Sequence, residues 1–166
     1  MADLTIAERL QPSLLDRLTD DQPKSKDESR RERVIDIKRL RDIIQRDLSW
    51  LLNTTNLESE IDLEPYPQIQ SATINFGVID VAGKRGGVNR AIEIRQAIRT
   101  SIENFEPRIL PGSLEVELYQ EMIEGGGAIV SFDIRGELWA QPVPLELYMR
   151  TALDITTGEV SLDRQF

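Results

Sequence analysis

The sequence contains no cysteine and no histidine among its 166 residues. Without cysteine there are no disulfides, no thiolate metal sites and no cysteine nucleophile. Without histidine there is no Ser-His-Asp triad and no histidine-ligated zinc, and the side chain best suited to proton transfer near neutral pH is missing. We therefore expect no catalytic site of the common hydrolase or metalloenzyme classes, no bound metal and no cofactor.

Aromatic residues and basic charge are also scarce. Aromatic residues make up 5% of the chain, and 20 Lys and Arg stand against 29 Asp and Glu, a formal net charge of −9. An acidic surface repels phosphate, so we expect neither nucleic-acid binding nor docking to an anionic membrane. No secretory signal is visible and no uncharged run is apolar enough to insert into a bilayer, which favours a cytoplasmic location.

A short apolar segment near the N-terminus precedes a highly charged stretch. Ser13 and Asp16 have the spacing of a weak capping box, which predicts a short helix, with a frayed terminus as the alternative. Ten of the fourteen residues from Asp20 to Arg33 are charged, as in a solvated linker. We interpret residues 1–33 as a flexible N-terminal docking segment and charged linker, although an unremarkable N-terminus has the same composition. The docking residues would be Leu14, Leu15, Asp16, Arg17 and Leu18.

Two stretches have the periodicity of amphipathic helices. From Val34 to Leu52, apolar residues recur in steps of three and four, Trp50 widens the apolar stripe, and Asn53 follows as a C-cap residue. The same steps run from Val88 to Phe105, and Pro107 ends that helix. Between the two helices we expect irregular structure and then a glycine-rich loop.

Beyond residue 108 the apolar period changes from 3.6 to 2. Alternation over 114–119, 130–135 and 145–154 predicts about three mostly antiparallel strands with one apolar face, and Gly125–Gly127 supplies a loop. The predicted class for residues 34–166 is α+β, two-layer, with N-terminal amphipathic helices packed on one face of a small sheet. The expected core is Leu114, Val116, Leu118, Val130, Phe132, Ile134, Leu145 and Leu147 on the sheet, facing Ile37, Leu40, Ile44, Leu48, Ile98 and Ile102 on the helices.

The opposite face of this sheet is expected to be acidic, because residues 109–166 carry 10 acids and only 3 bases. Solubility is one explanation, and a face complementary to a basic partner is the other.

Few motifs carry chemistry. Gly83-Lys84-Arg85 lacks the upstream glycine and the hydroxyl of a phosphate loop. Glycoside hydrolysis needs only two carboxylates, but nothing in the sequence marks a converging pair. The candidates are Glu58, Glu60, Glu64, Glu106, Glu121 and Glu124.

Glu106-Pro107-Arg108 joins the second helix to the first strand. Its spacing favours a structural turn at the helix end, and its opposite charges allow either a local pair or a contact with a partner.

Several segments resemble one known family in order and spacing. They are 12–18 (PSLLDRL), 47–54 (DLSWLLNT), 75–77 (NFG) with Asp80, 98–108 ending in Glu-Pro-Arg, and 153–154 with 157–158. Together they resemble the baseplate wedge family, which includes the type VI secretion subunit TssE and a T4 phage wedge protein once called a lysozyme. The segment 12–18 points to the secretion branch. Thr55 departs from the pattern, because many relatives have Arg at this place.

The resemblance implies a structural role in the baseplate of a contractile injection machine, at the cytoplasmic side of the bacterial inner membrane. The implied partners are the other baseplate wedge subunits and the contractile sheath protein, and the implied interaction signature is Glu106, Pro107 and Arg108. Two alternatives remain, a cell-wall glycosidase that uses two carboxylates and a cytoplasmic regulatory adaptor of the same fold.

Overall fold

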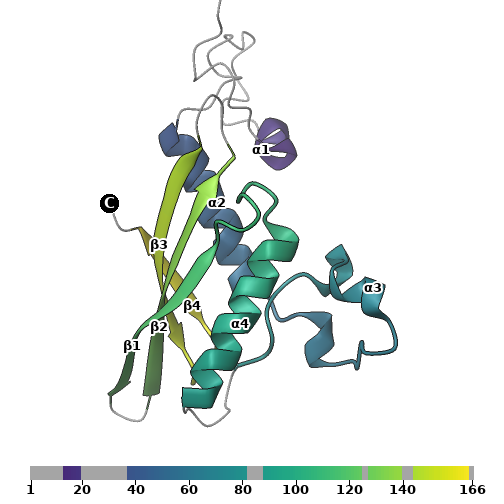
Figure 1. Cartoon of the computed structure of the whole chain (residues 1–166), viewed down its shortest axis with the longest axis vertical. Coiled ribbons are helices and arrows are strands. Elements are labelled where there is room, and N and C mark those ends of the chain that lie inside the picture. Colours follow the sequence, from purple (N-terminus) through teal and green to yellow (C-terminus); the bar gives the residue numbers. More distant parts are fainter. Residues whose placement is uncertain (1–12, 20–36, 82–87, 125–126, 140–143, 165–166) are drawn as a thin grey trace, which may run out of the picture.

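The computed structural model describes residues 13–19, 37–81, 88–124, 127–139 and 144–164 (Figure 1). The predicted linker at 20–33, the predicted helix start at 34–36 and the glycine-rich loops at 82–87 and 125–126 lie outside the described residues. Among the residues described, no helix combines the length and apolarity that a bilayer crossing requires.

In the described part of the chain, the helices precede the strands. They are α1 (Leu14–Leu18), α2 (Ile37–Leu52), α3 (Pro67–Gln70) and α4 (Val88–Phe105), with 3-10 turns η2 (Leu57–Ser59) and η3 (Thr73–Asn75). The strands are β1 (Glu115–Glu124), β2 (Gly127–Leu138), β3 (Leu145–Asp154) and β4 (Val160–Arg164). Each strand pairs antiparallel with the next, in the order β1-β2-β3-β4.

This arrangement confirms the α+β class. Along β3, buried and partly exposed residues alternate from Glu146 to Asp154, so one face of the sheet is covered and the other is open. α4 packs beside β1 and α2 beside β4, which places both long helices on the covered face (Figure 1). The helices are not all N-terminal, because α4 lies in the middle of the chain.

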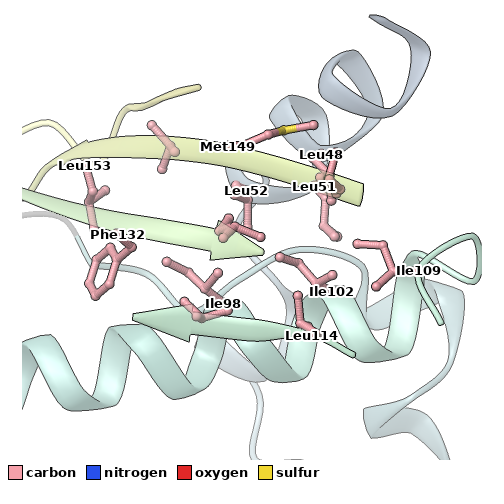
Figure 2. Packing of buried hydrophobic residues seen from close by; sticks show 14 of the residues in the cluster. Leu48, Leu51, Leu52, Ile98, Ile102, Ile109, Leu114, Phe132, Met149 and Leu153 are labelled. Carbon is pink, nitrogen blue, oxygen red and sulfur yellow. The ribbon is translucent and has the colours of Figure 1, made fainter. Parts of the chain in front are cut away.

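The core lies between the two long helices and the covered face of the sheet. Phe132, Leu48 and Ile102 are completely buried there (Figure 2). Ile134 and Ile44 are also completely buried in this core. Of the predicted core residues, Ile37 and Leu145 are partly buried and pack against this cluster. The sequence periods therefore identified most of the core, because a residue's direction from a helix or strand follows from its position in the repeat.

One predicted core position, Leu118, is wrong, and Trp50, which was expected to widen the apolar stripe of α2, is also mostly exposed. Leu118 is 47% exposed, and the register of β1 against β2 shifts between Leu118 and Gln120, so that a β-bulge interrupts the alternation there. Trp50 is 52% exposed, and its ring lies under the Arg46 guanidinium at 4.9 Å. Trp50 thus lies at the border of the apolar stripe, where a cation–π contact covers one ring face.

β4 is the strand that the sequence analysis missed. It has only two inward apolar positions, Val160 and Leu162, and it pairs with one neighbour. Asn53, directly after α2, fastens its first residue: the Asn53 amide donates to the Val160 carbonyl at 2.9 Å and accepts from the Val160 amide at 2.9 Å. The same amide donates to the Ser49 carbonyl at 2.8 Å, which confirms Asn53 as the cap of α2.

Candidate interaction site at the end of helix α4

Glu106 follows the last residue of α4, and Pro107 prevents the helix from continuing. Only 4% of Glu106 is exposed, so its carboxylate needs partners inside the protein. Arg108 supplies them: its Nε donates to Glu106 Oε1 at 2.6 Å, its backbone N–H donates to the same oxygen at 3.0 Å, and its Nη2 donates to Oε2. The motif is therefore a compact turn in which the two charges pair locally.

The same turn is tied to the sheet. The Arg108 carbonyl accepts from the Trp139 amide at 2.7 Å, and Ile109 forms an isolated antiparallel bridge with Leu138. The position of Arg108 is thus fixed by the end of β2 as well as by α4.

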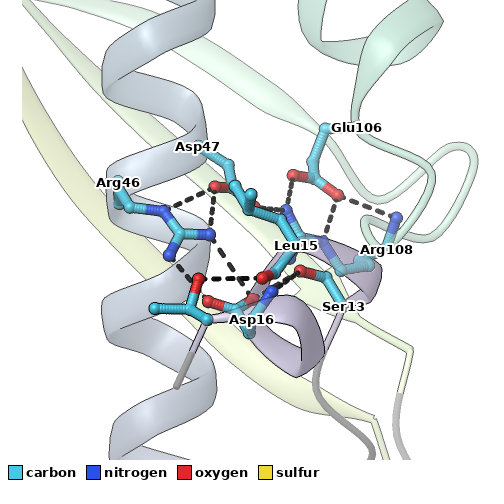
Figure 3. A network of polar contacts seen from close by, with 8 residues as sticks. Ser13, Leu15, Asp16, Arg46, Asp47, Glu106 and Arg108 are labelled. Carbon is cyan, nitrogen blue, oxygen red and sulfur yellow. Dashed lines mark hydrogen bonds and ion pairs between the residues drawn. The ribbon is translucent and has the colours of Figure 1, made fainter. Parts of the chain in front are cut away.

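Asp47 on α2 extends the pair into a network (Figure 3). Its Oδ2 accepts from Arg108 Nη2 at 2.7 Å, and its Oδ1 accepts from Arg46 Nη2 at 2.7 Å and from Arg46 Nε at 2.9 Å. One carboxylate on α2 therefore bridges two guanidinium groups, one of which belongs to the turn after α4.

Arg46 carries the network on to α1. Its Nη1 lies 2.7 Å from Asp16 Oδ1, and the Asp16 side chain is only 4% exposed. Ser13 is the N-cap residue of α1, and its hydroxyl accepts from the Asp16 amide, which confirms the capping-box helix. α1 therefore contacts α2 through its polar side.

The apolar side of α1 faces away from the protein. Leu14 is 72% exposed and Leu18 is 75% exposed, and Leu15 is 48% exposed. The structure describes the backbone of Arg17 but not its side chain. The three leucines therefore form an exposed apolar surface on a helix whose polar side is held to α2 by an ion pair.

The hydrogen bonds and ion pairs of the network shift the pKa values of Asp16 and Arg108 in favour of their charged forms. At Asp16 the largest single influence is burial, which acts to raise its pKa, but hydrogen bonds from Arg46 and Ser13 and the nearby positive charges outweigh it, so the pKa of Asp16 is lowered. At Arg108 burial likewise acts against the charged form, and the Glu106 and Asp47 carboxylates outweigh it and raise the pKa of Arg108. The network as a whole sets three carboxylates against two guanidinium groups.

The structure thus joins the two predicted binding segments. Asp16 in α1 and the Glu106-Pro107-Arg108 turn are linked through Arg46 and Asp47, neither of which was singled out as a site residue. Asp47 begins the segment 47–54 that resembles the family, but the resemblance gave it no role. A charged pair on a helix surface is ordinary, and its partners lie 30 and 61 positions away in the sequence.

The open face of the sheet has a second polar cluster. Asp133, 6% exposed, accepts from Arg150 Nε at 2.7 Å and from the Tyr148 hydroxyl at 2.8 Å. The Arg150 guanidinium also stacks 3.4 Å from the Tyr119 ring centroid, and Arg135 lies over the Tyr148 ring. The expected acidic face therefore carries two arginines, and both pair with Asp133, Arg150 at 2.7 Å and Arg135 at 3.7 Å.

The candidate carboxylates do not share a described cleft. Glu58, Glu60 and Glu64 are exposed and Glu106 is paired with Arg108, while the side chains of 121 and 124 lie outside the described part. Within the described ranges, no three acidic side chains gather as a metal site requires. A small pocket is lined only by aliphatic side chains of α2, α4, the 78–81 segment, β3 and β4.

Comparison with known proteins identifies the family. A family model described as baseplate wedge protein gp25 matches residues 38–143, a range that contains Arg46, Asp47 and the Glu106-Pro107-Arg108 turn. Searches of the curated proteins and of the solved structures found no match. Because the matched range covers more than half of the chain and the fold is the expected one, this protein belongs to the baseplate wedge protein gp25 family, the family of TssE, and is a structural component of a baseplate.

Proposed function

We propose that this protein is the TssE-type subunit of a type VI secretion baseplate, at the cytoplasmic side of the bacterial inner membrane. In this role it binds the other wedge subunits and connects the baseplate to the contractile sheath, with no catalytic activity of its own. Family membership supports the baseplate role. The secretion branch is supported by the Pro-Ser-Leu-Leu-Asp-Arg-Leu segment, residues 12–18, which lies before the matched range.

The observation that carries the proposal is the chain of ion pairs from α1 to Arg108. It places two segments that both carry a binding prediction side by side, with Leu14 and Leu18 open to solvent. Arg108 keeps 28% of its side chain exposed while its guanidinium is held by Glu106 and Asp47. A partner that covers this region would bury the exposed leucines and meet a preorganised arginine, a residue type that is enriched among the positions that dominate binding energy at protein interfaces.

The leucine surface is tested by Leu14→Ser with Leu18→Ser. The matched control is Ile92→Ser on α4, because Ile92 is likewise an exposed apolar residue, with 51% of its surface exposed. We expect the double variant to lose co-purification with wedge subunits and sheath assembly in cells, while its melting temperature and that of the control stay unchanged. Normal assembly by the double variant would contradict the docking role of α1.

The turn requires a different design, because Arg108→Ala would leave the buried Glu106 carboxylate largely uncompensated. That alone costs roughly 3–5 kcal/mol, so a loss of assembly would not separate folding from binding. The double variant Glu106→Gln with Arg108→Met removes both charges and keeps similar volumes, so neither Glu106 nor Arg108 is left as an unpaired charge.

We expect this double variant to remain folded and to bind sheath or wedge subunits at least about tenfold more weakly, since a truncated interface arginine typically costs ~2–5 kcal/mol. A folded variant with a working sheath would exclude an interface at Glu106-Pro107-Arg108. Glu106→Gln alone serves as the control that retains the cation.

A further inference from the structure

A protruding segment, residues 54–81, leaves the domain after α2 and returns before α4 (Figure 1). Its two ends are joined at the base: the Asn56 amide donates to the Val78 carbonyl at 2.9 Å, and the Val78 amide donates to the Thr54 carbonyl at 2.8 Å. The Ser101 hydroxyl of α4 donates to the Gly77 carbonyl at 2.7 Å. The base of the protrusion is therefore fastened to the domain.

The interior of the protrusion is held by buried amide side chains. Asn75, 3% exposed, accepts from the Glu58 amide at 3.0 Å and donates to the Gln70 carbonyl at 3.0 Å, so one residue ties η2 to α3 and η3. Asn56, 8% exposed, caps η2, and Leu63 is buried within the segment. The protrusion is thus a preorganised loop, which lowers the entropic cost of binding through it.

Three large apolar side chains on this loop are open to solvent. Tyr66 is 58% exposed, Ile61 is 51% exposed and Ile74 is 68% exposed. Within the loop the buried residues are Asn56, Leu63 and Asn75, and near its C-terminal end Phe76, Val78, Ile79 and Val81 pack in or against the domain core. The three exposed side chains belong to neither cluster. Tyrosine in particular is enriched at protein interfaces, where it supplies a rigid apolar body with a polar tip.

The charge of the loop is of one sign. It contains Glu58, Glu60, Asp62, Glu64 and Asp80, and the sequence has no Lys or Arg between Arg46 and Lys84. Such a surface repels nucleic acid and anionic lipid. A second copy of this chain is also disfavoured, because the whole chain carries a net charge of −9. The complementary partner is a basic protein surface.

We propose that the protrusion is a second docking surface, separate from the α1 surface, and that it binds a basic protein surface by inserting Tyr66, Ile61 or Ile74 into apolar pockets rimmed by Lys and Arg. The proposal does not depend on which machine the baseplate belongs to. It requires only a partner whose contact surface is positively charged.

The test uses the full chain in cells that carry the complete set of neighbouring assembly subunits. A photocrosslinking residue, p-benzoylphenylalanine, is introduced at position 66, and a control is introduced at position 92, which has similar exposure on α4. We expect a single dominant crosslink from position 66, absent from position 92, to a peptide of another protein that contains Lys or Arg. Glu60→Lys with Glu64→Lys should lower the yield at least about tenfold, as expected for loss of an interface contact.

The matched charge control is Glu115→Lys with Glu146→Lys, two exposed acids on the sheet. It should leave the crosslink from position 66 intact, and both double variants should melt at the temperature of the parent chain. The proposal is overturned if position 66 gives no crosslink or crosslinks to a second copy, to lipid or to nucleic acid. It is also overturned if the crosslinked peptide lacks basic residues or if the two double variants behave alike.

Discussion

Single polar side chains hold this fold at points where regular secondary structure stops. Asn53 satisfies a carbonyl at the end of α2 and both backbone groups of Val160, so it replaces a ladder partner for the first residue of β4. Buried backbone groups need such partners, and a side chain that provides several of them cannot be exchanged for an apolar one without loss.

We predict that Asn53→Ala destabilises the domain by roughly 1–3 kcal/mol, because it removes these hydrogen bonds and leaves groups at the α2–β4 junction unpaired. Chemical denaturation measures the change. Asn104→Ala is a control on an asparagine at the solvent-facing end of α4, and it should have little effect. Equal stability of the Asn53 variant and the parent chain would show that β4 does not depend on this amide.

Asp133 predicts a pH dependence. The hydrogen bond from Arg150, aided by Tyr148 and the nearby arginine charges, lowers the pKa of Asp133 in the fold from its ordinary value of 3.8 despite burial. The folded state then binds fewer protons than the unfolded state near this pH, so Asp133 stabilises the fold above about pH 4 and loses this contribution as pH falls through the folded pKa.

Asp133→Asn should therefore lower stability at pH 7 and flatten the decline of stability below about pH 4. Urea denaturation at a series of pH values measures both effects. Asp163→Asn, at an exposed position of β4, serves as the control and should leave the acid limb unchanged. An unaltered acid limb in the Asp133 variant would contradict the assigned role of this carboxylate.

At the scale of elements, the spacing of apolar residues correctly predicted those helices and strands whose formation depends on residues close together in the sequence. The helices at 37–52 and 88–105 and the first three strands follow from apolar period, and the α1 capping box follows from two residues, Ser13 and Asp16. β4 has too few apolar positions to form a pattern. The same limit applies to the candidate site. Both binding segments could be identified in the sequence, but their proximity in the fold depends on the Arg46–Asp16 and Arg108–Asp47 ion pairs, which join residues distant in the sequence.

The protruding segment has one position where only glycine fits. Gly77 has a φ of 125°, and a Cβ there would lie 2.2 Å from the Thr54 carbonyl oxygen. We predict that Gly77→Ala costs at least ~1–3 kcal/mol and loosens the base of the protrusion, because both the backbone conformation and the close approach are violated.

Amide hydrogen exchange measures this effect locally, at Asn56 and Val78, whose N–H groups join the two ends of the protrusion. Gly112→Ala is an informative control: its φ is also positive, at 83°, but no atom lies within 4 Å of an added Cβ. Faster exchange confined to the Gly77 variant fits the predicted clash, whereas equal effects of both variants would assign the cost to backbone conformation alone.

At the scale of the whole molecule, one core unites the helical layer and the sheet. Phe132 of β2 is completely buried in this core (Figure 2). We predict that Phe132→Ala costs roughly 3–5 kcal/mol, the usual range for a large aromatic removed from a packed interior. Thermal denaturation compares it with Tyr119→Ala in β1, which is 52% exposed and should be much milder. Similar losses at both positions would contradict the placement of the core.

The pairing of α2 with β4 also has a consequence for synthesis of the chain. Asn53 and Val160 are 107 positions apart, so at about 5–20 residues per second a ribosome needs roughly 5–20 s after making the end of α2 to deliver its partner strand. Until β4 is made, the part of the apolar stripe of α2 that packs against β4 stays uncovered. The nascent chain therefore passes through a stage with a partly uncovered helical layer, and this is when we expect chaperones to be engaged and slower translation to increase aggregation.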